Sequence, residues 1–254
     1  MKSFFITGAA GFIGSHICEH ISINFPKAKI YALDKLTYAG NKKFLNNLIK
    51  NKKFKFIRSD IIESKKYLKY LKNIDCAINV AAESHVDNSF LNSINFTKTN
   101  AYGAHIFLQN CINNKVKKII HISTDEVYGD KTKGTSKEDD KLNPTNPYSA
   151  SKAAAEMIIN SYKFVYKKNI IIIRANNIMH GKIDKIMHQN NSKIFKDIPA
   201  TFDATRYHSL IIKEDSIPPT LSITARSSDN CIMGIKHKRF PIFGVQFHPE
   251  SIKT

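Results

Sequence analysis

The chain contains 254 residues, of which 42% are hydrophobic and 24% are charged, so it suits one large or two small globular domains and excludes a disordered chain. No apolar run approaches the roughly 20 residues of a membrane helix, so we expect no membrane partner. The formal net charge of +18 is spread over many short lysine clusters without zinc-finger spacing, which disfavours a nucleic-acid partner and a metal site. The four cysteines are widely spaced, as is typical of a reduced, cytoplasmic protein.

The first 177 residues alternate short β-rich runs with longer amphipathic stretches. This pattern predicts an α/β fold, a Rossmann-type doubly wound parallel sheet, with strands at 3–6, 29–33, 55–58, 76–80, 118–123 and 170–174. Beyond Asn177 the helical periods largely vanish, and strands are predicted at 204–212, 221–225, 232–236 and 243–247. We therefore predict two domains, residues 1–177 and a smaller β-rich domain of residues 178–254, joined without a linker.

A glycine-rich turn, Thr7-Gly8-Ala9-Ala10-Gly11-Phe12-Ile13-Gly14, follows the first predicted strand and opens a predicted helix. Glycines in this position allow a tight turn and close approach of the backbone to a pyrophosphate. Asp34 ends the second strand, where a carboxylate accepts hydrogen bonds from ribose hydroxyls and repels a 2′-phosphate. NAD is therefore favoured over NADP, although the adjacent Lys35 weakens that preference.

Two further strand ends fit the same cofactor. Asp60 follows the third strand, where it can reach the adenine, and the small residues Ala81 and Ala82 follow the fourth. Together with the glycine turn and Asp34, these positions predict a dinucleotide site rather than a set of ordinary turns.

Tyr148 and Lys152 are four residues apart, directly after a proline suited to a helix start, so both lie on one helix face. An ammonium near the phenol lowers its pKa, which would allow Tyr148 to act as a base near neutral pH. Asp125 and Glu126 follow the fifth strand. A protonated and an ionised carboxyl side by side can protonate a leaving hydroxyl and remove a carbon-bound proton, which is dehydration chemistry.

Residues 1 to about 177 resemble the N-terminal part of the dTDP-glucose 4,6-dehydratases, which are extended short-chain dehydrogenase/reductases. The matching segments are residues 7–14, 33–41, 81–87, 99–100 and 124–126, with Tyr148, Lys152, Asn176 and Asn177. The resemblance implies a nucleotide-sugar substrate, NAD held as a prosthetic group, and a homodimer through helices near 100–111 and 148–166. The substrate lobe that follows in that family is not recognisable in this chain.

The resemblance also implies roles for individual residues. Tyr148 would take the 4-hydroxyl proton, Glu126 the C5 proton, and Asp125 would protonate the departing 6-hydroxyl, with Thr124 orienting the 4-hydroxyl. The implied cofactor residues are Gly8, Gly11, Phe12, Ile13, Gly14, Asp34, Lys35, Thr37, Asp60, Ile61, Ala81, Ala82, Thr99, Tyr148 and Lys152. The implied substrate residues are Ser84, His85, Thr124 and Asn177.

From about Met179 the chain instead resembles the C-terminal end of class I glutamine amidotransferases, most closely anthranilate synthase component II. The matching segments are residues 180–182, 205–210, 232–237 and 244–251. In that family the positions of His248 and Glu250 belong to a Cys-His-Glu triad. None of the four cysteines has the Gly-x-Cys-x-Gly setting of the nucleophile, so we expect no glutaminase activity from this chain.

Three functions therefore remain open. The first is an NAD-dependent dehydratase module fused to a partial amidotransferase. The second is an amidotransferase subunit of anthranilate synthase that docks on a synthase partner through residues 207–209 and needs a nucleophile from elsewhere. The third is a non-catalytic chimera joined at Asn177 and Ile178, an interpretation that transcripts continuous across the junction would test.

Overall fold

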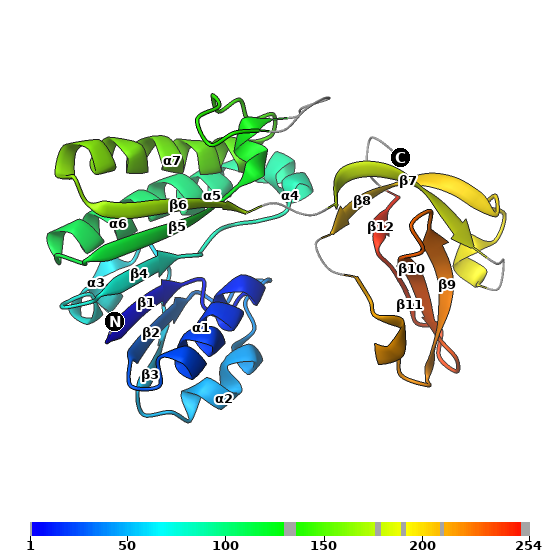
Figure 1. Cartoon of the computed structure of the whole chain (residues 1–254), viewed down its shortest axis with the longest axis horizontal. Helices are drawn as coiled ribbons and strands as arrows, with labels where there is room; N and C mark the ends of the chain where they lie inside the picture. Colours follow the sequence, from blue (N-terminus) through cyan, green and yellow to red (C-terminus); the bar gives the residue numbers. More distant parts are fainter. Residues whose placement is uncertain (1, 130–135, 176–178, 189–191, 209–210, 250–254) are drawn as a thin grey trace. The chain divides into compact units, whose positions relative to one another are not determined.

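The computed structural model describes residues 2–129, 136–175, 179–188, 192–208 and 211–249. The chain divides into two compact units, Met1–Ala175 and Asn176–Thr254, each with its own sheet (Figure 1). This division lies two residues before the boundary that the change of sequence pattern predicts. The unit with the glycine turn and the Tyr148–Lys152 pair is the first one.

The first unit contains a parallel sheet with the strand order β3-β2-β1-β4-β5-β6. Its strands are β1 (Ser3–Thr7), β2 (Lys29–Asp34), β3 (Phe54–Arg58), β4 (Cys76–Asn79), β5 (Lys118–Thr124) and β6 (Asn169–Ala175). The predicted Rossmann-type sheet is confirmed, and each predicted strand agrees within one residue at either end. The order reverses between β1 and β4, so the crevice that binds ligands in such sheets opens at the carboxyl ends of these strands.

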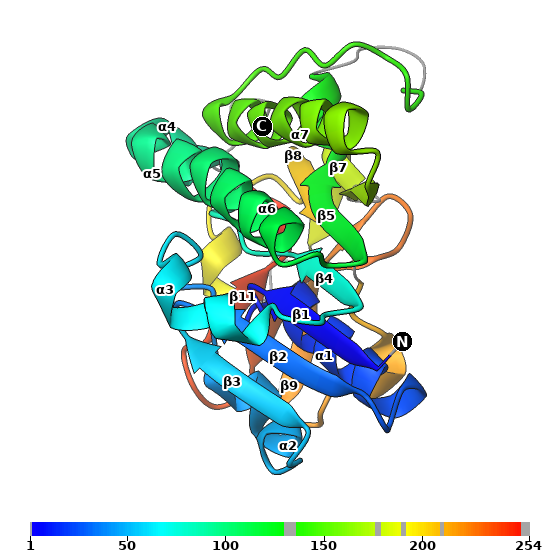
Figure 2. The same ribbon diagram turned by 90° about the vertical axis from the view of Figure 1, so that its left-hand side faces the viewer.

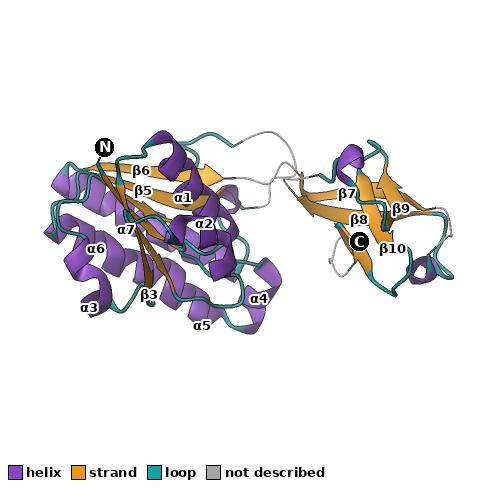
Figure 3. Cartoon of the chain, turned by 90° about the horizontal axis from the view of Figure 1, so that it is seen from below, coloured by secondary structure: helices purple, strands orange, loops and turns teal. Residues whose placement is uncertain are grey.

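Helices cover both faces of this sheet (Figure 3). The α-helices are α1 (Phe12–Asn24), α2 (Asn46–Ile49), α3 (Ser64–Tyr67), α4 (Val86–Leu91), α5 (Ser93–Phe96), α6 (Ala104–Asn113) and α7 (Pro147–Tyr166). Short 3-10 turns are η1 (Lys42–Leu45), η2 (Leu68–Tyr70), η4 (Asp125–Tyr128), η5 (Lys193–Phe195) and η6 (Glu214–Ser216), and η3 (Thr97–Gly103) is a π-helical stretch. No helix among the described residues has the length and apolar character needed to cross a membrane.

Two apolar cores hold these layers together. On one face Tyr67 of α3, Phe107 of α6 and Ile159 of α7 pack against the sheet. On the other face Cys18 and Ile21 of α1 pack with the residues of η1 and α2. Helix α6 contacts α7 and β4, and α7 contacts β5. Figure 2 shows the two helices side by side along the sheet. Helix α7, which carries Tyr148 and Lys152, is thereby fixed over the end of β5.

The second unit is an antiparallel sheet with the order β11-β10-β9-β7-β8-β12. Its strands are β7 (Met179–His188), β8 (Thr201–His208), β9 (Leu221–Ser227), β10 (Ile232–His237), β11 (Phe243–Val245) and β12 (Phe247–His248). A small core of Ile186, Phe195, Met233 and Phe247 fills it. The predicted β-rich fragment is confirmed, but β8 starts and ends earlier than predicted, and β7 was not predicted.

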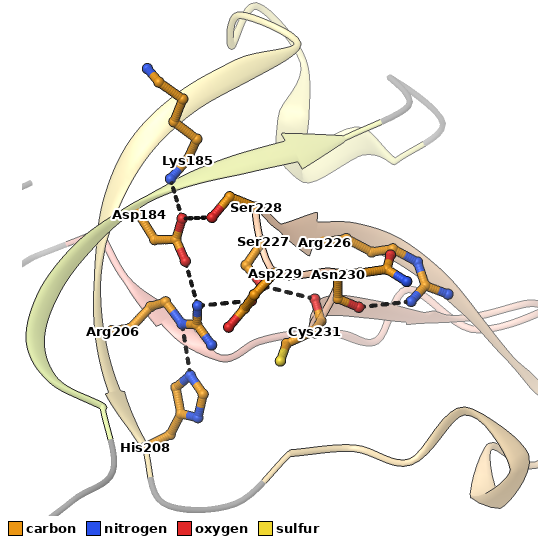
Figure 4. A network of polar contacts seen from close by, with 10 residues as sticks. All are labelled: Asp184, Lys185, Arg206, His208, Arg226, Ser227, Ser228, Asp229, Asn230 and Cys231. Carbon is orange, nitrogen blue, oxygen red and sulfur yellow. Dashed lines mark hydrogen bonds and ion pairs between the residues drawn. The ribbon is translucent and has the colours of Figure 1, made fainter.

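Strand β7 is not recognisable from the sequence because several of its polar residues face the interior and several of its apolar residues face the solvent. Its polar residues Asp184 and His188 are buried with Ile186, whereas Ile183 and Met187 are exposed. Alternation of polar and apolar residues normally places the apolar side inward. The buried carboxylate of Asp184 accepts a hydrogen bond from Arg206 of β8 (Figure 4). This ion pair offsets the cost of burying a charged group within the sheet.

Candidate active site

The glycine turn links β1 to α1 and lies against the backbone of the residues that follow β4. Gly8 has φ +64°, and a Cβ there would lie 2.7 Å from the nitrogen of Ala81. A Cβ on Gly14 would lie 2.0 Å from the carbonyl oxygen of Gly8. Helix α1 begins after Gly11 without a side-chain cap, so no side chain takes the first N–H groups that would meet a phosphate. Phe12 and Ile13 are exposed at this helix start.

Asp34 holds the glycine turn to the end of β2. Its Oδ2 accepts from the Ala10 N–H at 2.8 Å and its Oδ1 from the Leu36 N–H at 2.7 Å, while the side chain is largely buried. Each carboxylate oxygen has lone pairs left after these bonds, so both can still accept ribose hydroxyls. The exposed Thr37 lies on the loop that follows Leu36.

Lys35 forms an ion pair with Asp60, which follows β3. Its ammonium lies 2.7 Å from the Asp60 carboxylate, and the hydrogen bond to Asp60 is the main cause that raises the pKa of Lys35. Asp60 also accepts from the N–H of Ile62 at 3.1 Å. The side chain of Ile61 lies in the apolar core, so only its backbone is left to face a cofactor.

The end of β4 supplies the next wall of the site. The Thr7 hydroxyl accepts from the Ala81 N–H at 3.1 Å, which ties this strand end to β1. Ala82 is exposed and Thr99 is half-buried. The substrate candidates Ser84 and His85 follow on the same loop.

That loop meets the segment after β2. The Tyr38 hydroxyl donates to the Ser84 carbonyl at 2.9 Å, and its ring centroid is 5.9 Å from that of His85. Asn177, the other predicted substrate residue, lies outside the described residues.

The catalytic candidates meet at the end of β5. The Thr124 hydroxyl accepts from the Glu126 N–H at 3.3 Å, at the start of η4. Helix α7 opens with a capping box in which the Asn146 side chain accepts from the Ser149 N–H. The amide of Asn146 also donates to the Glu126 carboxylate at 3.2 Å. The cap of the helix with Tyr148 and Lys152 therefore holds the candidate base.

The electrostatics of the Tyr148–Lys152 pair differ from the sequence expectation. Burial and the charges of Glu126 and Asp125 raise the pKa of Tyr148 to about 12. Burial lowers the pKa of Lys152 to about 8, and its ammonium donates to the Ile122 carbonyl at 2.6 Å. The prediction of a lowered pKa for Tyr148 is wrong, because burial of the phenol and the nearby carboxylates of Glu126 and Asp125 raise its pKa.

Several positioning residues were not predicted. Asn100 is almost fully buried, accepts from the Glu83 N–H at 2.8 Å, and donates to the Ser151 hydroxyl at 2.9 Å. Sequence analysis placed Asn100 in a matched segment without a role. A buried asparagine that joins a strand-end loop to α7 shows itself only in three dimensions.

A second buried set crosses three neighbouring strands in register. The Thr7 hydroxyl donates to Asn79 Oδ1 at 2.5 Å, and Asn79 Nδ2 lies 3.0 Å from His121 Nδ1. Burial and nearby Lys152 lower the pKa of His121 well below its ordinary value, so this histidine is neutral. These three residues connect the end of β1, where the glycine turn begins, to β5, whose Ile122 carbonyl accepts from Lys152.

The amidotransferase-type residues lie in the second unit. His248 is half-buried on β12, where it pairs with Thr205 of β8. Glu250 lies outside the described residues. Cys231 is a half-buried free thiol between β9 and β10, next to the Asp229 turn of Figure 4.

The strand order, the glycine turn and the Tyr148–Lys152 pair define the first unit as an extended short-chain dehydrogenase/reductase. The chain belongs to the GDP-mannose 4,6 dehydratase family, whose model matches residues 5–200. The class-I glutamine amidotransferase model matches residues 150–254 and overlaps the first match over residues 150–200. Where the two matches overlap, α7 and β6 belong to the first unit and β7 to the second.

Relatives with established names match the first part of the chain. The dTDP-D-glucose 4,6-dehydratase of Dictyostelium discoideum is 44% identical over 195 residues, covering 72% of this chain and 45% of that protein. The human dTDP-D-glucose 4,6-dehydratase is 39% identical over 179 residues, covering 70% of this chain and 51% of that protein. A trifunctional UDP-glucose 4,6-dehydratase of Arabidopsis thaliana is 44% identical over 183 residues, 70% of this chain and 28% of that protein. The chain thus spans about half or less of these relatives.

Solved structures agree. The dTDP-glucose 4,6-dehydratase DesIV of Streptomyces venezuelae, with NAD and TYD bound, is 35% identical with a TM-score of 0.66, over 69% of this chain and 56% of that chain. A UDP-glucuronic acid 4-epimerase of Bacillus cereus is 30% identical with a TM-score of 0.63, over 68% of this chain and 55% of that chain.

Proposed function

We propose that this chain is an NAD-dependent nucleotide-sugar dehydratase, converting dTDP-glucose to dTDP-4-dehydro-6-deoxyglucose, fused to a partial amidotransferase. The observation that carries the proposal is the adjacent pair Asp125 and Glu126 at the end of β5, with Glu126 held by the cap of the helix that bears Tyr148. Epimerases need only the tyrosine–lysine pair and a cofactor. Two neighbouring carboxyls add the acid and the base that elimination of water requires.

NAD fits the residues present. The glycine turn leaves no room for side chains, the start of α1 has no side-chain cap, and Asp34 offers acceptor capacity at the sheet edge. The ion pair of Lys35 with Asp60 occupies the nearby ammonium, so no described cation of this loop is left to favour a 2′-phosphate next to Asp34. When bound, NAD supplies hydride acceptance from C4 of the sugar and hydride return to C6.

The protein groups move the protons. Tyr148 takes the proton of the 4-hydroxyl, Glu126 removes the C5 proton made acidic by the C4 ketone, and Asp125 protonates the 6-hydroxyl, which leaves as water. Glu126 then returns its proton to C5 when hydride adds to C6. Because burial and two carboxylates raise the pKa of Tyr148, the phenol must lose its proton before it can take that of the 4-hydroxyl, and the positive charges of Lys152 and of the oxidised cofactor would favour this ionised form. Lys152 also holds the cofactor ribose in this scheme.

The test is to incubate the purified chain with NAD and dTDP-glucose and to look for the dehydrated sugar nucleotide by mass spectrometry. Tyr148→Phe should lower product formation by about 100-fold or more. Tyr166→Phe, on the same helix but outside the site, should leave it unchanged. Because the Arabidopsis relatives are named for UDP-glucose, a parallel reaction with UDP-glucose tests the nucleotide. A folded chain that binds NAD and forms neither product would overturn the proposal and favour the non-catalytic chimera.

We also propose a homodimer in the cytoplasm. Large apolar side chains are exposed on α7, one of the two helices predicted to form the dimer, and on the neighbouring α4 and α5, which were not predicted to do so: Leu91, Ile94, Met157, Phe164 and Val165. An apolar surface of this kind on a helix layer is typical of an interface. Sedimentation of the parent and of Phe164→Glu tests the dimer, which the variant should weaken.

The amidotransferase match favours a second candidate function, docking of the tail on a synthase subunit. His248 and Glu250 would then act only with a cysteine from another chain. For this chain alone we expect no ammonia release from glutamine, and detectable release would contradict that expectation.

A further inference from the structure

Arg174, near the end of β6, reaches two elements of the candidate site. Its Nε and Nη2 both donate to the carboxylate of Glu156 on α7, at 3.0 and 2.7 Å. Glu156 is fully buried and Arg174 is partly buried. A carboxylate without access to water depends on such a two-pronged partner, which arginine provides and lysine does not.

The third nitrogen of the Arg174 guanidinium contacts η4, the turn that begins with Asp125 and Glu126. Nη1 donates to the hydroxyl of Tyr128 and to the carbonyl of Glu138, the latter at 2.8 Å. The guanidinium carbon lies 4.7 Å from the centroid of the Tyr128 ring, which adds a cation–π contact. One side chain thus joins α7, η4 and the segment before α7.

Tyr128 is the last residue of η4, and this turn starts with the two carboxyl candidates. The turn is held at its start by the 3.3 Å bond from the Glu126 N–H to Thr124, which is long for a hydrogen bond. At its end Val127 is buried and Gly129 donates to the Glu126 carbonyl at 3.0 Å. The contacts of Arg174 with Tyr128 therefore fix the end of the turn, while Thr124 and Asn146 hold its start.

Arg174 also controls the charge near Lys152. Glu156 lies one turn after Lys152 on α7, and its negative charge partly offsets the burial that lowers the pKa of Lys152. The guanidinium neutralises that carboxylate in direct contact.

We propose that Arg174 is a positioning residue for the dehydration step, because it ties the turn with Asp125 and Glu126 to the helix with Tyr148 and Lys152. The inference rests on the proposed function and deepens it. Oxidation at C4 depends on Tyr148 and the cofactor, whereas elimination of water depends on the placement of the two carboxyls relative to C5 and C6. Loosening the tether should therefore slow elimination more than oxidation.

The experiment compares full-length Arg174→Lys and Tyr128→Phe with the parent, and with Arg226→Lys as the matched control. Arg226 makes an ion pair of similar length, 2.8 Å, with Glu214, but in the second unit and with an exposed carboxylate. On mixing with NAD and dTDP-glucose, Arg174→Lys should accumulate reduced cofactor, seen by its absorbance, while product formation falls about 10- to 100-fold, as misplacement of a group by about 1 Å predicts. Tyr128→Phe keeps the buried ion pair and should show the same signature more weakly.

A second readout does not need catalysis. Backbone hydrogen exchange, followed by mass spectrometry, should become faster in residues 124–129 of both variants and stay unchanged in β1 and β2. If exchange in residues 124–129 becomes faster in the variants but the parent forms no product, the proposed function is refuted, while the contact of Arg174 with this turn stands. Equal slowing of oxidation and elimination, or unchanged exchange in the turn, would overturn the role of Arg174 while the function stands. If Arg174→Lys does not fold, Tyr128→Phe decides the test.

Discussion

Asp34 and Ala10 are joined by a 2.8 Å hydrogen bond from the backbone N–H of Ala10 to the carboxylate at the end of β2. The same carboxylate accepts from Leu36, so one side chain organises the glycine turn and the loop after β2. A residue that would bind the cofactor ribose therefore also shapes the turn that would bind its phosphates. We therefore expect a change at Asp34 to weaken cofactor binding through both the ribose contact and the glycine turn.

The first prediction is that Asp34→Ala weakens NAD binding by about 10- to 100-fold, because each hydrogen bond to a charged group contributes about 1.5–3 kcal/mol. Titration with NAD, followed by calorimetry, measures the change. Lys29→Ala serves as the control: Lys29 is exposed at the start of the same strand, away from its carboxyl end, so NAD affinity should stay unchanged. Equal NAD affinity of the parent and Asp34→Ala would contradict the cofactor assignment.

The first unit was predictable because its signals are local. Each strand is a short β-rich run, and the carboxyl ends of parallel strands must share one edge, so Gly8, Asp34 and Glu126 could be placed near one another from the sequence alone. What failed were properties that depend on neighbours far along the chain. The pKa of Tyr148 is set by its burial and by Glu126 and Asp125, and the spacing to Lys152 carries no information about that balance.

The supporting residues and strand β7 escaped prediction for the same reason. Asn100 and Asn146 look like ordinary helix asparagines until the loops they hold are placed in space. Strand β7 buries Asp184 and exposes Ile183, a choice that makes sense only with Arg206 opposite. Polar groups that are buried in pairs give no periodic signal in either member alone.

The second prediction separates two roles of Asn146. Asn146→Ala should lower the free energy of unfolding by about 1 kcal/mol, because the N-cap of α7 is lost, and should also slow elimination of water. Asn146→Ser keeps a capping hydroxyl but is too short to reach Glu126, so it should retain stability and still slow elimination. Urea unfolding and product formation measure the two effects. If serine restores activity fully, the contact with Glu126 has no role in the reaction.

The third prediction concerns pH. Folding lowers the pKa of Lys152 from 10.5 to about 8, so between these values the unfolded chain holds a proton that the folded chain has released. Stability from this group therefore rises as the pH rises through that window. Lys152→Met should remove this rise, whereas Lys163→Met, exposed on the same helix, should preserve it.

Urea unfolding between about pH 7.5 and 9.5 tests this, compared as the difference between parent and variant. The difference is the informative quantity because the raised pKa of the buried Cys18 acts in the opposite direction. Identical pH profiles of the parent and Lys152→Met would show that Lys152 stays protonated in the folded chain.

The fourth prediction tests the buried network of the second unit (Figure 4). Arg206 is fully buried and bonds to Asp184, to Asp229 at 3.0 Å, and to His208 at 2.9 Å. Arg206→Met would leave Asp184 buried without its cation, which costs about 3–5 kcal/mol. Arg226→Met removes a largely exposed ion pair and should cost at most about 1 kcal/mol.

Hydrogen exchange in β7 and β8 is the suitable measurement, because the chain has two units and a single unfolding transition is not guaranteed. In Arg206→Met these strands should exchange as fast as if unfolded, while β1 and β2 keep their protection. In the parent the same strands should lose protection as the pH falls below about 4, because Arg206 and the serine hydroxyls lower the pKa of both aspartates, and the stability they contribute above that pH disappears when they are protonated. Slow exchange of β7 in Arg206→Met would mean that the buried carboxylate does not depend on this arginine, and that the inverted pattern of the strand has a different cause.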